Sequence, residues 1–265
     1  MAGKTAIVTG GGGLLGKQFS LTLAQAGAQV LVADFNLNLA QQQAELITAE
    51  GYQAKACQVD VTDPGSTQQM AQQAYEAFGS LDVLVNCAAL DPKFDEEHQS
   101  KFFSNAFEEY PLAAWQASIN VNLTGVFLAT QAVVRYMLHQ EQGVIINISS
   151  TYGLAGPDQS IYPQVDGRQQ HKPVDYSVTK AGILGFTRYL AAYYAGTKIR
   201  VNALTPGGIY NQHDEEFTNN YAARTILGRM ADLDEMNGAL LFLASDASSY
   251  MTGSNLIVDG GWTAW

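Results

Sequence analysis

The chain is short of positive charge. Its 265 residues include 14 Lys and Arg against 25 Asp and Glu, a formal net charge of −11. Binding to nucleic acid or to an anionic membrane requires clustered Lys and Arg, so we expect neither kind of partner. The remaining composition, 47% hydrophobic and 15% charged, is that of a globular protein long enough to bury a core.

Cysteine is scarce, and membrane-spanning apolar runs are missing. Cys57 and Cys87 lie far apart in separate apolar runs, which predicts buried free thiols; a disulfide or metal pair is the alternative. No His, Cys and Asp cluster has metal-ligand spacing, so we expect no metal. The apolar stretch 181–196 is interrupted by Arg188 and is too short to cross a bilayer. The first residues run straight into a strand pattern, so we expect no signal peptide and a cytoplasmic protein.

Short apolar strands alternate with helical segments along the chain. Helical patterns cover 14–26, 36–51 and 64–79, and the last has Pro64 at its start and Gly79 after its end. Strand patterns cover 5–9, 29–34, 54–60, 81–86, 143–149, 199–205 and 255–260. This alternation predicts an α/β fold, a doubly wound parallel sheet with helices on both faces, in a single domain spanning 1–265. Two long stretches, 90–111 and 153–174, interrupt the rhythm, and loops of this length are often functional.

A glycine-rich turn, TGGGGLLG at 9–16, joins the first strand to the first helix. Gly11, Gly13 and Gly16 satisfy the G-x-G-x-x-G pattern that lets a backbone approach a pyrophosphate at a helix N-terminus. Asp34 ends the second strand 18 residues after Gly16. A carboxylate there accepts hydrogen bonds from a ribose and repels a 2′-phosphate, which favours NAD over NADP.

A second motif, YSVTK, indicates proton transfer. Tyr176 and Lys180 are four residues apart and share one face of a helix. A free tyrosine has a pKa of about 10, and a nearby ammonium lowers it by stabilising the phenolate. Tyr176 is therefore a candidate general acid or base for a substrate hydroxyl or carbonyl.

Two further polar sites surround this pair. Ser149 and Ser150 end the strand 143–149, at the sheet edge where open α/β sheets bind ligands. Asn122 lies in a predicted helix, where its amide is a candidate to hold a proton-relay water. A capping serine and a buried, hydrogen-bonded asparagine are the alternatives.

These motifs resemble those of the short-chain dehydrogenase/reductase family over nearly the whole chain. VDVTD, LVNCAA, NVNLTG, NISS, YSVTK, RVNALTPGGI and LIVDGG follow the glycine turn in the family's order. The resemblance implies a Rossmann-type fold with a seven-stranded parallel sheet. It also implies the catalytic tetrad Asn122, Ser150, Tyr176 and Lys180.

The same resemblance implies a role for each tetrad member. The tyrosine is the general acid/base, and the lysine lowers its pKa and binds the nicotinamide ribose. The serine orients the substrate, and the asparagine supports a proton relay. The cofactor residues implied are Gly10, Gly13, Leu14, Leu15, Gly16, Asp34, Phe35, Asp60, Val61, Asn86, Ala88, Tyr176, Lys180, Pro206, Gly207 and Ile209.

The glycine turn departs from the family's commonest spacing, TGxxxGxG, because Leu14 stands where a glycine is usual. The spacing that fits is TGxxGxxG, with Gly10, Gly13 and Gly16, and is more typical of the family's extended branch. In this interpretation Gly11 and Gly12 supply turn freedom.

A larger departure lies between Ser150 and Tyr176. They are 26 residues apart, about twice the separation usual in the family. This longer segment, together with TPGGI, KFF at 101–103 and VDYSVTKAGI, is similar to a subgroup linked to bacterial surface-sugar and sialic-acid-like pathways. That similarity implies a sugar, sugar acid or polyol as substrate. The insertion near 153–174 is expected beside the substrate. Its basic residues Arg168, His171 and Lys172 are candidates, with Ser150, for substrate binding; a solvated loop balanced by acidic neighbours is the alternative. We expect His98 and His213 at the exposed surface.

The sequence therefore predicts an NAD-dependent oxidoreductase that interconverts a secondary alcohol and a ketone, with a small-molecule substrate. One alternative is an NADP-linked ketone or 3-oxoacyl reductase. Another is a dinucleotide-binding regulator without catalysis. The resemblance implies a homotetramer or homodimer, and the apolar helix after Lys180 and the tail GGWTAW suit burial in such an interface.

Overall fold

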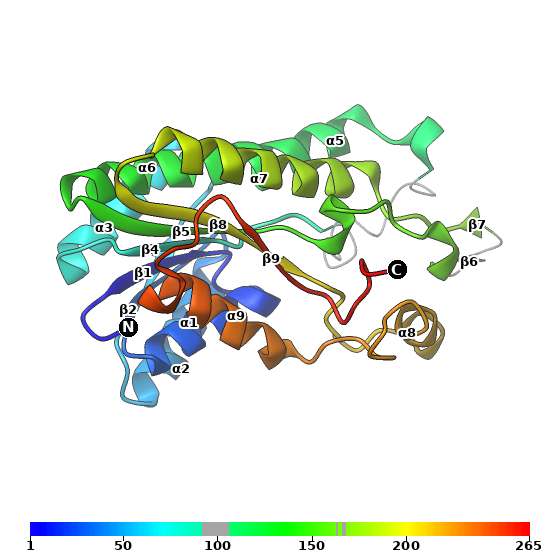
Figure 1. The fold of residues 1–265 in the computed structure, drawn as a ribbon, viewed down its shortest axis with the longest axis horizontal. Coiled ribbons are helices and arrows are strands. Elements are labelled where there is room, and N and C mark those ends of the chain that lie inside the picture. Colours follow the sequence, from blue (N-terminus) through cyan, green and yellow to red (C-terminus); the bar gives the residue numbers. More distant parts are fainter. Residues whose placement is uncertain (92–105, 163, 166–167) are drawn as a thin grey trace.

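A parallel sheet of seven strands forms the centre of the molecule in the computed structural model, which describes residues 1–91, 106–162, 164–165 and 168–265 (Figure 1). The strand order is β3-β2-β1-β4-β5-β8-β9, and every pair of neighbours is parallel. The strands are β1 (Thr5–Thr9), β2 (Gln29–Asp34), β3 (Ala54–Gln58), β4 (Val83–Asn86), β5 (Gln142–Ile148), β8 (Lys198–Pro206) and β9 (Asn255–Val258). The predicted Rossmann-type fold is confirmed. The order reverses between β1 and β4, where open α/β sheets bind ligands outside the carboxyl ends.

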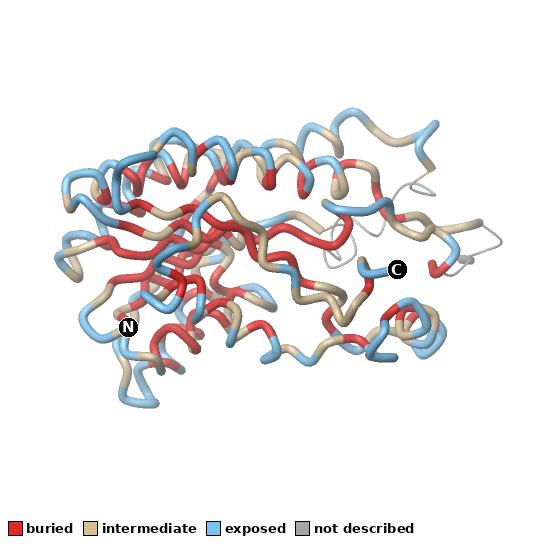
Figure 2. Tube along the Cα trace, viewed as in Figure 1, coloured by how far each residue is buried: buried red, intermediate tan, exposed pale blue. Residues whose placement is uncertain are grey.

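Helices cover both faces of this sheet (Figure 1). One layer contains α1 (Leu14–Gln25), α2 (Leu37–Ala49) and α9 (Asn237–Ala244), and the other contains α3 (Pro64–Phe78), α6 (Val126–His139) and α7 (Val174–Tyr193). Side chains alternate along each strand, so Ala6 and Val8 join the core beneath the first layer and Ile7 joins the second. This double burial explains the continuously apolar strands, and Figure 2 shows the buried residues concentrated there.

Side-chain caps determine where the early helices begin. The Asn36 side chain accepts from the N–H groups of α2, and Asp63 does the same for α3, with Pro64 in the first turn. Gly79 ends α3 with a φ of 83°, a left-handed conformation that favours glycine. The predicted start and end of this helix are therefore confirmed.

One long helical segment, Leu112–His139, contains a wider turn in its middle. It consists of α5 (Leu112–Ile119), a π-helical turn at Asn120–Gly125, and α6. By length and composition alone this segment could cross a membrane, but half of its most apolar part is buried inside the protein. Its α6 portion packs on α3 and β5, as the core helix of a layered fold does.

The insertion between Ser150 and Tyr176 folds onto the carboxyl edge of the sheet. It contains 3₁₀ turns at Thr151–Gly153 and Gln159–Ile161 and an antiparallel hairpin of β6 (Gln164–Val165) and β7 (Arg168–Gln169). It shares a third apolar cluster with α8 (Glu215–Ala222) and the C-terminal tail. That cluster comprises Tyr152, Ile161, Tyr162, Phe217, Tyr221, Met230 and Trp262.

Two expectations about single residues need correction. Trp262 stacks on Tyr221 at 4.3 Å between ring centroids, so this part of the tail is buried within its own chain rather than in an interface. Cys57 is a buried free thiol as predicted, but Cys87 is half-buried, because it follows β4 at the rim of a cavity.

Candidate active site

A cavity of about 1110 Å³ runs along the carboxyl edge of the sheet. One end is lined by the glycine turn and Asp34, and the other by Ser150, Tyr176 and Lys180. Ligand sites usually enclose roughly 300–1,000 Å³, so this one is large enough for a dinucleotide together with a small substrate. The sheet therefore brings together residues that lie more than a hundred positions apart in the sequence.

The glycine turn is packed so closely that side chains are excluded. Gly10 has a φ of +65°, and a Cβ there would lie 2.7 Å from the Cα of Ala88. A Cβ on Gly16 would overlap the carbonyl oxygen of Gly10, and one on Gly12 would lie 2.6 Å from Leu39. The predicted turn freedom of Gly11 and Gly12 is wrong, because neither has a positive φ. Both are needed for close packing instead.

This turn leaves an open cradle that fits a pyrophosphate. Gly13 is the N-cap of α1 and has no side-chain cap, so the first N–H groups of the helix face the cavity end lined by Gly13, Leu14 and Leu15. The residues present therefore fit a nicotinamide dinucleotide.

Asp34 is held in place at the end of β2. Its Oδ2 accepts from the N–H of Gly12 and its Oδ1 from the N–H of Asn36, both at 2.9 Å. Asp60 also lines this end, and its Oδ1 accepts from the N–H and hydroxyl of Thr62. Among the described residues that line the cavity, the Lys and Arg side chains are Lys172 and Lys180, both beside Tyr176. The Asp34 end is therefore negative.

The remaining predicted cofactor residues divide into two groups. Those that line the cavity are Phe35, Val61, Ala88, Pro206, Gly207 and Ile209. Asn86 does not line it: its Nδ2 donates to Thr130 and Asn147, in a buried network that joins β4, β5 and α6. The prediction for the Asn86 side chain is wrong, because it faces the core from the last position of β4.

Tyr176, Ser150 and Lys180 meet at the other end. The Ser150 hydroxyl lies close enough to the Tyr176 phenol to lower its pKa. Lys180 Nζ lies 5.7 Å from the Tyr176 ring centroid and donates to the carbonyl of Ile148 at 2.9 Å. Ser149 instead donates to the carbonyl of Lys180 at 2.8 Å. Of the two serines, Ser150 is therefore the one beside the tyrosine.

Burial opposes charge on both titrating groups. Burial and then Asp91 raise the pKa of Tyr176, and the nearby Ser150 hydroxyl lowers it in part. Burial lowers the pKa of Lys180 to about 8. The phenol is therefore the resting form, and phenolate formation depends on positive charge nearby.

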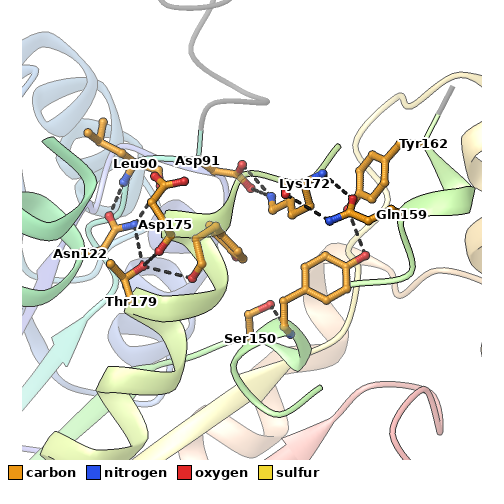
Figure 3. Close-up of polar contacts among 11 residues, drawn as sticks. Leu90, Asp91, Asn122, Ser150, Gln159, Tyr162, Lys172, Asp175 and Thr179 are labelled. Atoms are coloured by element: carbon orange, nitrogen blue, oxygen red, sulfur yellow. Dashed lines mark hydrogen bonds and ion pairs between the residues drawn. The ribbon is translucent and has the colours of Figure 1, made fainter. Parts of the chain in front are cut away.

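Asn122 lies in the π-helical turn, and its side chain hydrogen-bonds the backbone of Leu90 (Figure 3). Its Oδ1 accepts from Leu90 N–H at 2.7 Å, and its Nδ2 donates to the Leu90 carbonyl at 3.0 Å and to Thr179 Oγ1 at 3.3 Å. The amide is 1% exposed and does not line the cavity. The expectation of an amide holding a relay water is corrected, because protein groups already occupy its donor and acceptor.

The basic residues of the insertion differ in their position relative to the cavity. Lys172 is buried, lines the cavity and pairs with Asp91, so it is not the free anion-binding group expected (Figure 3). His171 is half-buried and does not line the cavity. The side chain of Arg168, like residues 98 and 101–103, lies outside the described part of the chain.

Several cavity residues were missed from the sequence. Asp91, Tyr152, Tyr162 and Tyr221 line the substrate end, and so does His213, which was expected at the surface. His213 Nδ1 accepts from the N–H of Asn211, and its ring packs on Phe217. Asp91 and Tyr162 lie in the long stretches 90–111 and 153–174, but Tyr152, His213 and Tyr221 lie outside them, and no sequence signal indicated these three. The part of the chain that the structure describes holds no group of three or more metal-binding side chains.

Comparisons with known proteins agree with this geometry. The family model described as enoyl-(acyl carrier protein) reductase matches residues 14–263. The chain is 35% identical to the 3-oxoacyl-(acyl-carrier-protein) reductase of Thermotoga maritima over 268 residues, which cover 98% of each protein. It is 35% identical to the cis-4-hydroxycyclohexanecarboxylate dehydrogenase of Sinomonas cyclohexanicum over 268 residues, covering 99% of this chain and 98% of the relative.

A solved structure extends the match. The crystal structure of a gluconate 5-dehydrogenase from Burkholderia cenocepacia, in complex with NADP and tartrate, matches with a TM-score of 0.86 and 29% identity, over 100% of this chain and 97% of that one. The chain belongs to the short-chain dehydrogenase/reductase family. It is an oxidoreductase that acts on CH–OH groups with a nicotinamide dinucleotide and a small-molecule substrate.

Proposed function

We propose that this enzyme is an NAD-dependent dehydrogenase that interconverts a secondary alcohol and a ketone on a compact hydroxylated substrate. One observation supports this proposal. The cavity has Tyr176, Ser150 and Lys180 at one end and Asp34 at the other. The domain spans 1–265, and the insertion near 153–174 forms part of the substrate wall.

Each catalytic side chain has a role that follows from its contacts. In oxidation, Tyr176 takes the proton of the substrate hydroxyl, and Lys180 stabilises the phenolate that receives it. Ser150 hydrogen-bonds the same substrate oxygen and holds it beside Tyr176. Asn122 does not contact the substrate; its hydrogen bonds hold the backbone of Leu90, which lines the cavity. The dinucleotide, when bound along the glycine turn, supplies the hydride acceptor.

NAD is the cofactor that the Asp34 end favours. The carboxylate is fixed by Gly12 and Asn36, and the second acidic side chain there, Asp60, adds negative charge. A 2′-phosphate would meet repulsion there, because no Lys or Arg is among the described residues that line this end. A relative was crystallised with NADP, so direct comparison of the two cofactors is needed. Calorimetric titration with NADH and NADPH tests this, and tighter binding of NADPH would refute the preference.

The substrate end favours a small molecule with several hydroxyl groups. Tyr152, Tyr162 and Tyr221 present aromatic faces, while Asp91 and His213 add polar groups. Aromatic faces with a few placed polar groups suit a sugar, sugar acid or polyol. Names of two relatives, a gluconate dehydrogenase and a hydroxycyclohexanecarboxylate dehydrogenase, support compact hydroxylated substrates. The narrower link to surface-sugar and sialic-acid-like pathways remains a hypothesis.

A second candidate is an NADP-linked 3-oxoacyl reductase, favoured by the Thermotoga maritima relative. A screen decides between the two: NADH formation with sugars, sugar acids and polyols, against NADPH consumption with an acetoacetyl thioester. Turnover confined to the thioester would replace the main proposal. Binding of dinucleotide without turnover in either arm would instead indicate the regulator expected as a further alternative.

Assembly into a homodimer or homotetramer in the cytoplasm completes the proposal. Tyr189 and Tyr193 on α7 stack on each other and are each about two-thirds exposed. Phe127 on α6, a helix of the same layer, is about half-exposed. Large exposed apolar groups of this kind suit an interface. Size-exclusion chromatography with light scattering tests the assembly, and a monomeric mass at micromolar concentration would contradict it.

A further inference from the structure

The segment that precedes α7 brings a buried lysine to the Tyr176 ring. Lys172 Nζ lies 3.8 Å from the ring centroid, and only 4% of its side chain is exposed. Lys172 comes directly before Pro173, which disfavours a helical conformation for it, and α7 begins at Val174. The chain thus enters the helix with the lysine outside it, over the residue proposed to exchange the proton.

Asp91 holds the ammonium of Lys172. The Nζ atom lies 2.8 Å from Oδ1 and 2.9 Å from Oδ2 of Asp91, which follows β4 81 residues earlier in the chain. Desolvation makes a buried ion pair weak as a source of stability. Stability alone therefore does not explain why the Lys172–Asp91 pair lies in the cavity wall, and we look for its role in the chemistry of the site.

Uncharged side chains hydrogen-bond the backbone at or beside each member of the Lys172–Asp91 pair (Figure 3). Gln159 Oε1 accepts from the N–H of Lys172 at 2.8 Å. Asn122 hydrogen-bonds the N–H and carbonyl of Leu90, the residue before Asp91. The two charges are thus held at the tyrosine by separate parts of the fold, the insertion and the π-helical turn.

We propose that Lys172 and Asp91 are positioning residues that tune the acidity of Tyr176, the ammonium stabilising its phenolate and the carboxylate opposing it. The proposal rests on the proposed function, in which Tyr176 exchanges the proton. An ammonium within about 4–6 Å of an acid favours its charged form, and Lys172 Nζ lies closer than this, 3.8 Å from the Tyr176 ring centroid.

Other titratable groups also surround the ring. Lys180, on the same helix, supplies the second ammonium at 5.7 Å. Tyr152 from the first 3₁₀ turn and Tyr221 from α8 remain neutral near pH 7, because burial raises the pKa of each. Lys172 and Asp91 are therefore the charges that the insertion and the loop after β4 add to the Lys180 ammonium.

The test is the pH dependence of kcat/KM for oxidation of the most active alcohol found in the screen. Lys172→Met removes the ammonium, so the midpoint of the acid limb should rise by about one pH unit. Asp91→Asn removes the opposing carboxylate, so the midpoint should fall. Lys172→Arg should keep it close to the wild-type value. Lys4→Met, which breaks the 3.0 Å ion pair with Asp82 outside the cavity, is the matched control and should shift nothing.

Opposite shifts in the two variants would support the proposal, because a purely structural defect lowers activity without moving a midpoint in a charge-dependent direction. Unchanged midpoints, or shifts in the same direction, would overturn it. If one variant fails to fold, the other decides alone. Tyr176→Phe separates the two ideas: full turnover in that variant refutes the proposed function, whereas a dead variant with unmoved Lys172→Met and Asp91→Asn midpoints refutes only the tuning.

Discussion

The backbone N–H of Gly12 donates to Asp34 Oδ2 at 2.9 Å. This bond joins the glycine turn to the end of β2, so the same carboxylate both shapes the turn and makes this end of the cavity negative. Under the proposed function, cofactor choice and loop conformation are therefore linked through one side chain.

Replacing Asp34 separates those two effects. Asp34→Asn keeps an oxygen that accepts from Gly12 but removes the charge. Like charges brought together cost several kcal/mol, so the preference for NAD over NADP should fall at least about tenfold. The measurement is kcat/KM with each cofactor. Asp63→Asn, which alters an exposed capping carboxylate of α3, should leave the ratio unchanged. An Asp34→Asn ratio equal to wild type would mean that charge does not set the preference.

Close packing at Gly16 predicts a local failure. In Gly16→Ala the new Cβ overlaps the Gly10 carbonyl oxygen, so the free energy of unfolding should fall by about 1–3 kcal/mol and dinucleotide affinity should drop. Gly238→Ala is the control, because that glycine lies in the first turn of α9 with open space around it. Its free energy of unfolding should rise by about 0.5–1 kcal/mol. Urea denaturation measures both, and a Gly16→Ala protein as stable as wild type would contradict the packing argument.

Removing the Asn122 amide should weaken the fold and the site together. In Asn122→Ala the partly buried N–H and carbonyl of Leu90 lose their partners, which should cost about 1–3 kcal/mol in the free energy of unfolding. Activity should fall further than stability explains, because Leu90 precedes Asp91. Asn120→Ala is matched: it lies in the same π-helical turn, is exposed, and bonds only Gln116 among the described residues. Equal effects of the two variants in urea denaturation and kinetics would remove the special role of Asn122.

Burial of Lys180 predicts a pH-dependent stability. Its pKa is about 8 in the folded chain against an ordinary value of 10.5, so between these pH values unfolding takes up a proton. The contribution of Lys180 to the free energy of unfolding is therefore least favourable below pH 8 and improves as pH rises through this window. Burial raises the pKa of Cys57 to about 11 and of Cys87 to about 12, which gives the opposite slope.

The difference between wild type and Lys180→Met isolates the lysine from the cysteines. Urea denaturation at pH 7.5 and at pH 9.5 should show the wild type gaining stability relative to the variant at the higher pH. A constant difference across this range would show that Lys180 titrates near its ordinary value in the folded protein.

Local patterns were sufficient to predict much of the molecule. Apolar runs predicted all seven strands of the central sheet. Burial on both faces explains these runs for the inner strands, whereas the edge strands β3 and β9 are only partly buried. Asp34 and the Tyr176–Lys180 pair were found because each follows from spacing along one or two neighbouring elements.

Contacts between residues far apart in the chain could not be predicted from the sequence. Nothing near Lys172 in the sequence indicates Asp91, because the pair forms only when the insertion folds back over the end of β4. Asn86 and Asn122 looked alike as polar residues at ligand-facing positions. The direction of each side chain, toward Asn147 in the core or toward Leu90, is decided by tertiary packing.

The cavity is built from two separate halves of the chain. Its cofactor end comes mainly from residues before Val61 and its substrate end mainly from residues after Ile148. Substitutions that reshape the insertion therefore leave the glycine turn and Asp34 untouched. Such a division makes the substrate range open to change, by evolution or by engineering, while affinity for the dinucleotide is retained.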